Sequence, residues 1–208
     1  MQGDSTLMSI STYADLRTSV ANWLKRSDMT DVIPDLIMLG EKRIYRELRI
    51  KCMETALSDT ISGGVIAVPS DYLELKFAYI DGSPTTRLDR QDPEFIYATY
   101  PSRSADGVPR HIAREGDSFI FGPYPDAGYT VKGIYYKTFG NVSDSAHALF
   151  TKAPDLYLFA ALSEAAAYKI QDARIPVWEG KYMESKTRLQ SEDKRERFSG
   201  SPLQMTAR

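Results

Sequence analysis

The residues of this chain that could do chemistry are few, and their spacing matches no common catalytic or metal site. The chain contains two histidines, His111 and His147, and one cysteine, Cys52. Neither histidine has the partner spacing of a metal site, such as His-x-x-x-His, so a surface position is the favoured interpretation of both. Cys52 is interpreted as a small buried apolar group at a helix–strand junction, since a nucleophilic cysteine needs a histidine nearby in space.

Two pairs of carboxylates and one glycine pair are the remaining candidates. Asp71 with Glu74, or Asp89 with Asp92, could form the acid pair of a glycosidase or the metal-binding acids of a nuclease, but nothing in the sequence marks them as buried. Ser62-Gly63-Gly64 lacks the Lys-Ser/Thr of a phosphate-binding loop and precedes a strand pattern, which predicts a hairpin turn. The sequence therefore predicts no catalytic residue, no cofactor, no metal site and no enzymatic activity.

The amino-acid composition narrows the possible functional classes further. The 208 residues carry 26 basic and 28 acidic side chains, a formal net charge of −2, which argues against strong electrostatic capture of nucleic acid. A single cysteine excludes a disulfide scaffold. No apolar run is long enough to span a membrane, and residues 1–11 do not have the pattern of a signal peptide, so we expect synthesis in a reducing cytoplasm.

Helical patterns bracket a strand-patterned middle. The first pair covers about 12–49 and begins with Thr12 and Asp15, which resemble a capping box with a shorter acid. Gly40 falls in mid-helix at a cost of about 1 kcal/mol, so we expect another helix to approach it closely. The second pair covers about 153–197.

Between the helices, alternating patterns and turn signals predict several short strands over about 53–139. The strongest is Tyr72–Ile80, with Leu73, Leu75, Phe77 and Tyr79 expected on one face. The strands suggest a small antiparallel sheet, sandwich or barrel. The predicted fold is α+β: residues 12–50 and 151–197 form a helical bundle, 51–150 form an inserted antiparallel β-rich lobe, and 198–208 form an extended C-terminal arm.

Candidate contact residues lie on the helices and the arm. Arg43, Arg46 and Arg49 lean toward one helix face, which favours a solvated face or a subunit contact over DNA binding. Trp178 and Tyr182 are sparse apolar residues on the last helix, and with Arg43 and Arg46 they are the predicted subunit interface. The arm is either a disordered terminus or a peptide that orders on a partner, with apolar anchors. Those anchors are Phe198, Pro202 and Leu203.

Taken together, four stretches in this order resemble the head-to-tail adaptor (connector) proteins of tailed bacteriophages, chiefly short-tailed ones. Each is weak alone, but their joint order is fairly specific and covers most of the chain. The stretches are Tyr13–Arg49 with its Trp23-Leu24-Lys25-Arg26 segment, Val68–Leu75, Thr151–Leu162 and Arg197–Leu203. Residues 1–11 fall outside the resemblance.

This resemblance implies a function in the virion neck, after assembly in the host cytoplasm. It implies a ring of twelve copies that binds the portal protein, the tail tube or nozzle and possibly tail fibres, and lines the channel through which phage DNA passes without sequence-specific binding. Relatives of this type use C-terminal segments to reach the portal, which makes residues of about 193–208 the expected portal-docking arm. They bring no catalytic residues, cofactor or membrane contact.

Two other functions remain open from the sequence. A virion-associated hydrolase or nuclease would bring Asp71, Glu74, His111 and Asp117 into one pocket. A carbohydrate-binding lobe on a helical stalk would expose aromatic side chains along a groove within 53–139.

Overall fold

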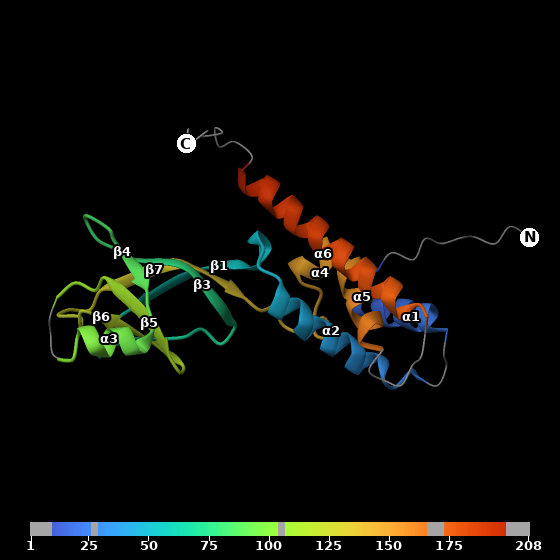
Figure 1. Ribbon diagram of the computed structural model, residues 1–208, viewed down its shortest axis with the longest axis horizontal. Helices are drawn as coiled ribbons and strands as arrows, with labels where there is room; N and C mark the ends of the chain where they lie inside the picture. Colours follow the sequence, from blue (N-terminus) through green and yellow to red (C-terminus); the bar gives the residue numbers. More distant parts are fainter. Residues whose placement is uncertain (1–9, 26–28, 104–106, 166–172, 199–208) are drawn as a thin grey trace, which may run out of the picture. The chain divides into compact units, whose positions relative to one another are not determined.

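The computed structural model describes residues 10–25, 29–103, 107–165 and 173–198 (Figure 1). The chain divides into two compact units, one formed by residues 1–52 with 139–208 and the other by 53–138. We call them the helical unit and the sheet unit. Six α-helices and a seven-stranded mixed sheet in the described residues confirm the predicted α+β class. No helix in these ranges is long and apolar enough to cross a membrane.

Among the described residues, the named elements of the helical unit are five α-helices and the 3-10 helix η2. They are α1 Tyr13–Leu24, α2 Ile33–Glu47, η2 Lys51–Met53 (whose last residue falls in the sheet unit), α4 Ala148–Lys152, α5 Pro154–Glu164 and α6 Ile175–Phe198. The predicted capping box is confirmed at α1: the Asp15 N–H donates to Thr12 Oγ1 at 3.2 Å, and the Thr12 N–H donates to Asp15 Oδ2 at 2.9 Å.

Close packing of α2 on α5 explains the mid-helix glycine. A Cβ on Gly40 would lie 2.9 Å from the Ala161 nitrogen and 3.1 Å from the Ala160 Cβ. The predicted close approach of a helix at Gly40 is therefore confirmed, and small side chains on both helices make it possible. Most of α5 is buried, including Leu156, Tyr157 and Leu162.

A single stripe of side chains fixes α6 to the rest of the helical unit. Trp178, Tyr182, Ser185, Leu189 and Asp193 are all buried and recur at spacings of four, three, four and four residues. This is the period of one helix face. Two of the five are polar and are satisfied locally: the Ser185 hydroxyl donates to Asp155 at 2.6 Å, and Asp193 accepts from the Lys51 N–H at 2.6 Å.

The sheet unit is one sheet with the strand order β1-β7-β3-β4-β5-β6-β2, accompanied by the short helix α3 Pro93–Thr99. The strands are β1 Glu54–Thr60, β2 Val65–Ala67, β3 Tyr72–Ile80, β4 Thr86–Arg90, β5 His111–Glu115, β6 Ser118–Gly122 and β7 Thr130–Lys137. All described pairings are antiparallel except β4 with β5, which is parallel. The sheet is therefore mixed, and the prediction of a purely antiparallel lobe was wrong at this pair.

A bulge in β3 overturns the predicted alternation of that strand. The register against β7 shifts between Leu75 and Phe77, so the two residues no longer share a face. Leu75, Ala78 and Ile80 are buried in the core, whereas Phe77 is 40% exposed. The inserted residue moves the second half of the strand's apolar pattern to the opposite face.

Two boundaries differ from the sequence pattern. Residues 139–150, expected in the β-rich lobe, belong to the helical unit, where the Val142 N–H donates to Glu41 at 2.9 Å. The last helix runs through Phe198, one residue into the expected arm.

Candidate interaction surfaces

The acids and histidine that a hydrolase would need are not gathered in one place. His111 and Asp117 stand at opposite ends of the β5–β6 hairpin, since β5 spans His111–Glu115. Asp71 accepts a hydrogen bond from the Tyr135 hydroxyl at 2.8 Å, and Glu74 lies 3.7 Å from Arg90. The geometry of these four side chains gives no support to the hydrolase or nuclease hypothesis.

His147 is not a surface histidine, so that interpretation was wrong. Its ring stacks on Phe139 at 4.5 Å between centroids, and its Nε2 lies 3.2 Å from the Tyr45 hydroxyl and 3.4 Å from that of Tyr157. Its Nδ1 accepts from the Phe150 N–H at 3.3 Å, which caps the N-terminus of α4. Burial lowers the pKa of His147 to about 4, so the ring is neutral at pH 7 and serves as a helix cap.

Cys52 lies in η2, between α2 and β1, and is partly buried. Burial raises the pKa of its thiol, which disfavours the reactive thiolate. Neither histidine appears among the groups that perturb it. The structure is thus consistent with a packing role at a helix–strand junction.

Exposed aromatic residues of the sheet unit do not form a sugar-binding groove. Phe77, Phe95 and Tyr97 are 38–42% exposed. Two hollows of this unit contain none of these three residues. The aromatic residues that line the first hollow are Tyr72 and Phe119, and the second is lined by Tyr129. The carbohydrate-binding hypothesis therefore lacks the arrangement that it requires in this part of the chain.

Arg43, a predicted interface residue, is used inside the helical unit. Its guanidinium donates to both carboxylate oxygens of Glu179 on α6, at 2.9 and 2.5 Å, and to Glu47 on α2 at 3.1 Å. It also lies over the Tyr182 ring, 4.3 Å from the centroid. A fork-shaped cation shared between two acids and an aromatic ring holds α2 against α6.

This ion network lowers the pKa of Glu47 and of Glu179. Hydrogen bonds from Arg43 hold the pKa of Glu179 below its ordinary value. Burial alone would raise the pKa of Glu47, but hydrogen bonds from Lys186, Tyr182 and Arg43 outweigh it and lower the pKa. Both carboxylates are therefore charged at neutral pH, and the network is complete.

The other predicted interface residues divide into buried and exposed. Trp178 and Tyr182 are 1% and 0% exposed, within the stripe that fixes α6. A contact with a second copy at this helix would have to use exposed neighbours, of which Val177 is 60% and Met183 is 43% exposed. Arg46 is exposed and forms no ion pair with the described part of the chain.

Of the predicted portal-docking residues, only the first lies within the described residues. Phe198 is the last residue of α6. Pro202 and Leu203 lie outside the described residues.

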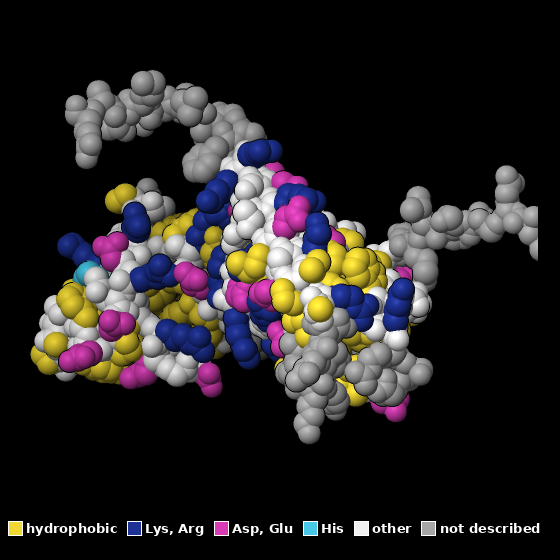
Figure 2. All heavy atoms as spheres, turned by 45° about the vertical axis from the view of Figure 1, so that its right-hand side comes forward, with side chains coloured by type: hydrophobic (Ala, Val, Ile, Leu, Met, Phe, Trp, Pro, Cys, Tyr) yellow, Lys and Arg dark blue, Asp and Glu magenta, His cyan; other side chains and the backbone are white. Residues whose placement is uncertain are grey.

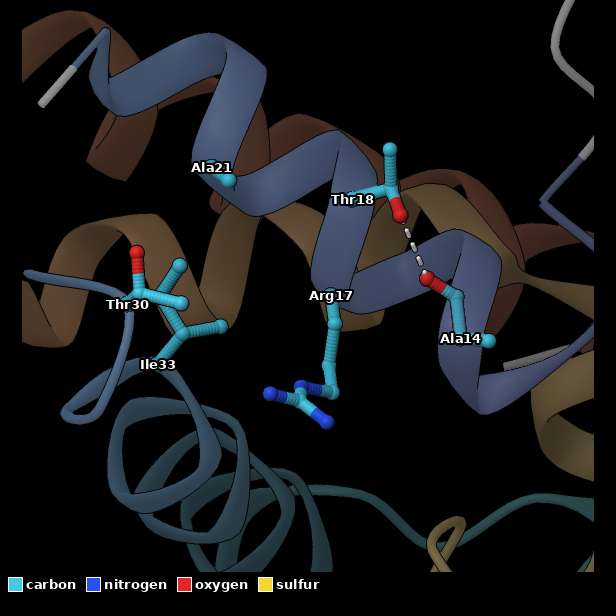
Figure 3. A pocket seen from close by; sticks show the side chains of 6 residues that line it. All are labelled: Ala14, Arg17, Thr18, Ala21, Thr30 and Ile33. Atoms are coloured by element: carbon cyan, nitrogen blue, oxygen red, sulfur yellow. Dashed lines mark hydrogen bonds between the residues drawn. The ribbon is translucent and has the colours of Figure 1, made fainter. Parts of the chain in front are cut away.

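Three hollows on the described surface of the helical unit are lined by polar or charged side chains. The first, of about 250 Å³, lies between α1 and the start of α2 (Figure 3). Ala14, Thr18 and Ala21 line it with small side chains, and Arg17 extends into the space beside them, so this hollow offers no catalytic group. The Thr18 hydroxyl is already used, donating to the Ala14 carbonyl at 2.9 Å.

The second hollow, of about 210 Å³, is acidic. Asp35 and Glu41 on α2 line it together with Asn141, Ser143 and Tyr13. Glu41 is only 4% exposed, and burial raises the pKa of its carboxyl. Its Oε1 accepts from the Val142 N–H, and no donor within the described residues reaches its Oε2.

The third hollow, of about 320 Å³, is mainly basic and lies at the C-terminal ends of α2 and α6. Arg49, Lys194 and Arg197 line it, with Asp193 as its acid. Sequence reasoning missed both charged hollows. The burial of Glu41 was not predictable, because the residue is followed by Lys42 and Arg43 in a charged stretch that is typical of a solvated helix face. The packing of residues 139–150 on α2 was not predicted either.

A family model described as SU10 adaptor protein matches residues 11–206, nearly the whole chain. No curated protein matches the chain.

Proposed function

Since this chain belongs to the SU10 adaptor protein family, a family of phage head-to-tail adaptors, we propose that it forms a ring between the portal and the tail. Family membership establishes a bacteriophage structural adaptor and implies contacts with other head and tail proteins. The ring, its twelve copies, its place at the portal and the short-tailed type of phage belong to the proposal. The family match over residues 11–206 is the observation that carries it.

Charge supports a channel-lining position. With 26 basic and 28 acidic residues, the chain has little net attraction for a polyanion, and DNA must pass such a ring without being held. In this proposal the DNA makes no base-specific contact, because sequence readout would slow its passage.

Attachment to the portal is assigned to the end of the chain. The proposed arm begins at the last residue of α6, Phe198, and has Pro202 and Leu203 as further apolar anchors. Apolar anchors in a Ser/Gly-rich segment suit a peptide that orders on its partner. The helical unit and its inserted sheet unit then remain for contacts with neighbouring copies and tail proteins.

The test is assembly with the portal of the same phage. Purified chain and portal are mixed, and complexes are examined by electron microscopy and by mass measurement with and without portal. A ring on the portal supports the proposal, whereas separate particles at micromolar concentrations contradict it. Deleting Ser199–Arg208 should leave the helical unit folded and weaken portal binding, and loss of soluble, folded protein on that deletion would show a structural role instead.

A further inference from the structure

The helical unit carries one acidic and one mainly basic hollow. The acidic hollow lies at the start of α2, where Asp35 occupies the first turn. The basic hollow lies beyond the last turn of the same helix, where Arg46 stands. At 1.5 Å per residue, Asp35 and Arg46 are about 17 Å apart along the axis, so the two hollows are separate patches.

The acidic hollow is built around a buried charge that lacks a full set of partners. Glu41 is 96% removed from solvent, and only one of its two oxygens has a described hydrogen-bond donor. Lys42 and Asp144 act on Glu41 electrostatically with opposite signs, and neither donates a hydrogen bond to its open oxygen. A buried carboxylate with an open oxygen, facing a hollow, is the environment in which an incoming cation gains most.

The end of α6 carries cations without partners of their own. Lys194 and Arg195 are exposed, and neither forms an ion pair with the described residues. Two of the nearby acids are engaged: Asp193 forms an ion pair with Arg197 at 2.7 Å, and Glu196 accepts from Lys152 at 2.9 Å. Figure 2 shows Lys and Arg side chains, in dark blue, gathered around this end of α6 with acidic side chains between them.

We infer that the end of α6 of one copy places Lys194 or Arg195 in the acidic hollow of the next copy. Because the two patches differ and lie apart on one chain, the contact runs head to tail, and repetition closes a ring when the rotation allows it. Charge complementarity selects a second copy as the occupant, since each chain supplies both halves. The inference rests on the proposed function and names the surfaces by which neighbours in the ring meet.

The test is a charge exchange between two variants. Asp35→Lys places a cation in the hollow beside Glu41, which cancels its acidic charge, and the double variant Lys194→Glu with Arg195→Glu reverses the charge of these two positions at the end of α6. Each alone places like charges together, and we expect self-association to weaken by at least about tenfold in sedimentation velocity at low salt. Mixed one to one, the two variants again pair opposite charges at every contact, so assembly should return. Wild-type association should weaken as salt rises.

Matched controls separate the contact from general effects of charge. Asp31→Lys makes the same change just before α2, outside the hollow, and Lys181→Glu with Arg188→Glu makes it on another part of α6. Both controls should assemble like the wild type. Circular dichroism checks that each variant folds, and Asp35→Asn, which only neutralises the charge, serves if Asp35→Lys does not fold.

Three results would overturn the inference: reversed variants that assemble like the wild type, a mixture of folded variants that does not recover, or a wild type that stays monomeric at low salt up to high concentration. The last result is also the one expected if the hollow takes a cation from a different protein. Portal binding, measured separately, distinguishes these failures from failure of the adaptor function, because a chain that binds portal without this contact leaves the proposed function standing.

Discussion

Acidification should destabilise the helical unit through His147. The neutral ring accepts the Phe150 N–H at Nδ1 and lies against two tyrosine hydroxyls and the face of Phe139. A protonated ring would carry a hydrogen on Nδ1, so two donors would face each other at the start of α4. Burial lowers the pKa of His147 from the ordinary 6.5 to about 4, so the folded state resists protonation.

The direction and size of the change in folding stability with pH follow from the difference in proton binding between the folded and unfolded states. Between these two pKa values the unfolded chain binds more protons at His147 than the folded chain, so stability falls as pH falls from about 6.5 toward 4. At about 1.4 kcal/mol per pH unit the full loss would be about 3 kcal/mol. We expect about 2 kcal/mol, because the ring is only part-buried and solvent screens part of the effect. Glu41, whose pKa is raised by burial, works in the opposite direction.

The assay is urea unfolding at several pH values between 7.5 and 4.5, followed by tryptophan fluorescence. Both tryptophans, Trp23 and Trp178, lie in the helical unit, so the signal reports that unit alone. His147→Asn keeps an N-cap side chain but does not titrate, and its stability should depend less on pH. His111→Asn, in the sheet unit, is the matched control. Equal pH dependence in wild type and His147→Asn would refute the reasoning.

Three further predictions concern packing and buried charge. Gly40→Val should destabilise the helical unit by about 1–3 kcal/mol, because its Cβ would enter the α5 backbone, and thermal unfolding measures this. Gly133→Ala should disrupt the sheet unit, since its Cβ would overlap the Phe77 carbonyl oxygen of β3. Gly140→Ala should be nearly neutral, because, apart from its chain neighbours, no described atom lies within 4 Å of a Cβ at this position. Circular dichroism during thermal unfolding measures both variants. Glu41→Gln keeps an acceptor for the Val142 N–H and removes a buried charge; its gain in stability should be largest at pH 7–8 and vanish below about pH 4, the reverse of the histidine effect.

Local signals in the sequence were enough for some elements and not for others. The capping box of Thr12 and Asp15 and the helix contact at Gly40 were predictable because each depends on one residue type in one conformation. The bulge in β3 was not, because the strand's own alternation of apolar residues continues unbroken through Phe77. A bulge depends on how β3 pairs with its neighbour β7, so the alternation within β3 alone does not indicate it.

The last helix shows why interface residues were harder to assign than core residues. Trp178 and Tyr182 looked like isolated apolar residues on a polar helix, which suggested a surface contact. Their stripe is completed by Ser185 and Asp193, which are buried because Asp155 and the Lys51 N–H satisfy them. A hydropathy pattern assigns serine and aspartate to the exposed surface, so it could not predict the buried face of α6.

The way the chain enters and leaves the sheet unit has a consequence for how such proteins diversify. Glu54, at the start of β1, is the cross-strand partner of Tyr136, near the end of β7. Partners of this kind lie about 5 Å apart, so the whole of 53–138 begins and ends at one point in space. Recombination between phage genomes could exchange this segment as a unit. Any replacement whose two ends lie close together would match the distance between the two points at which the segment joins the helical unit. Natural selection could then retune the sheet unit while the ion network and helix packing of the helical unit are inherited unchanged.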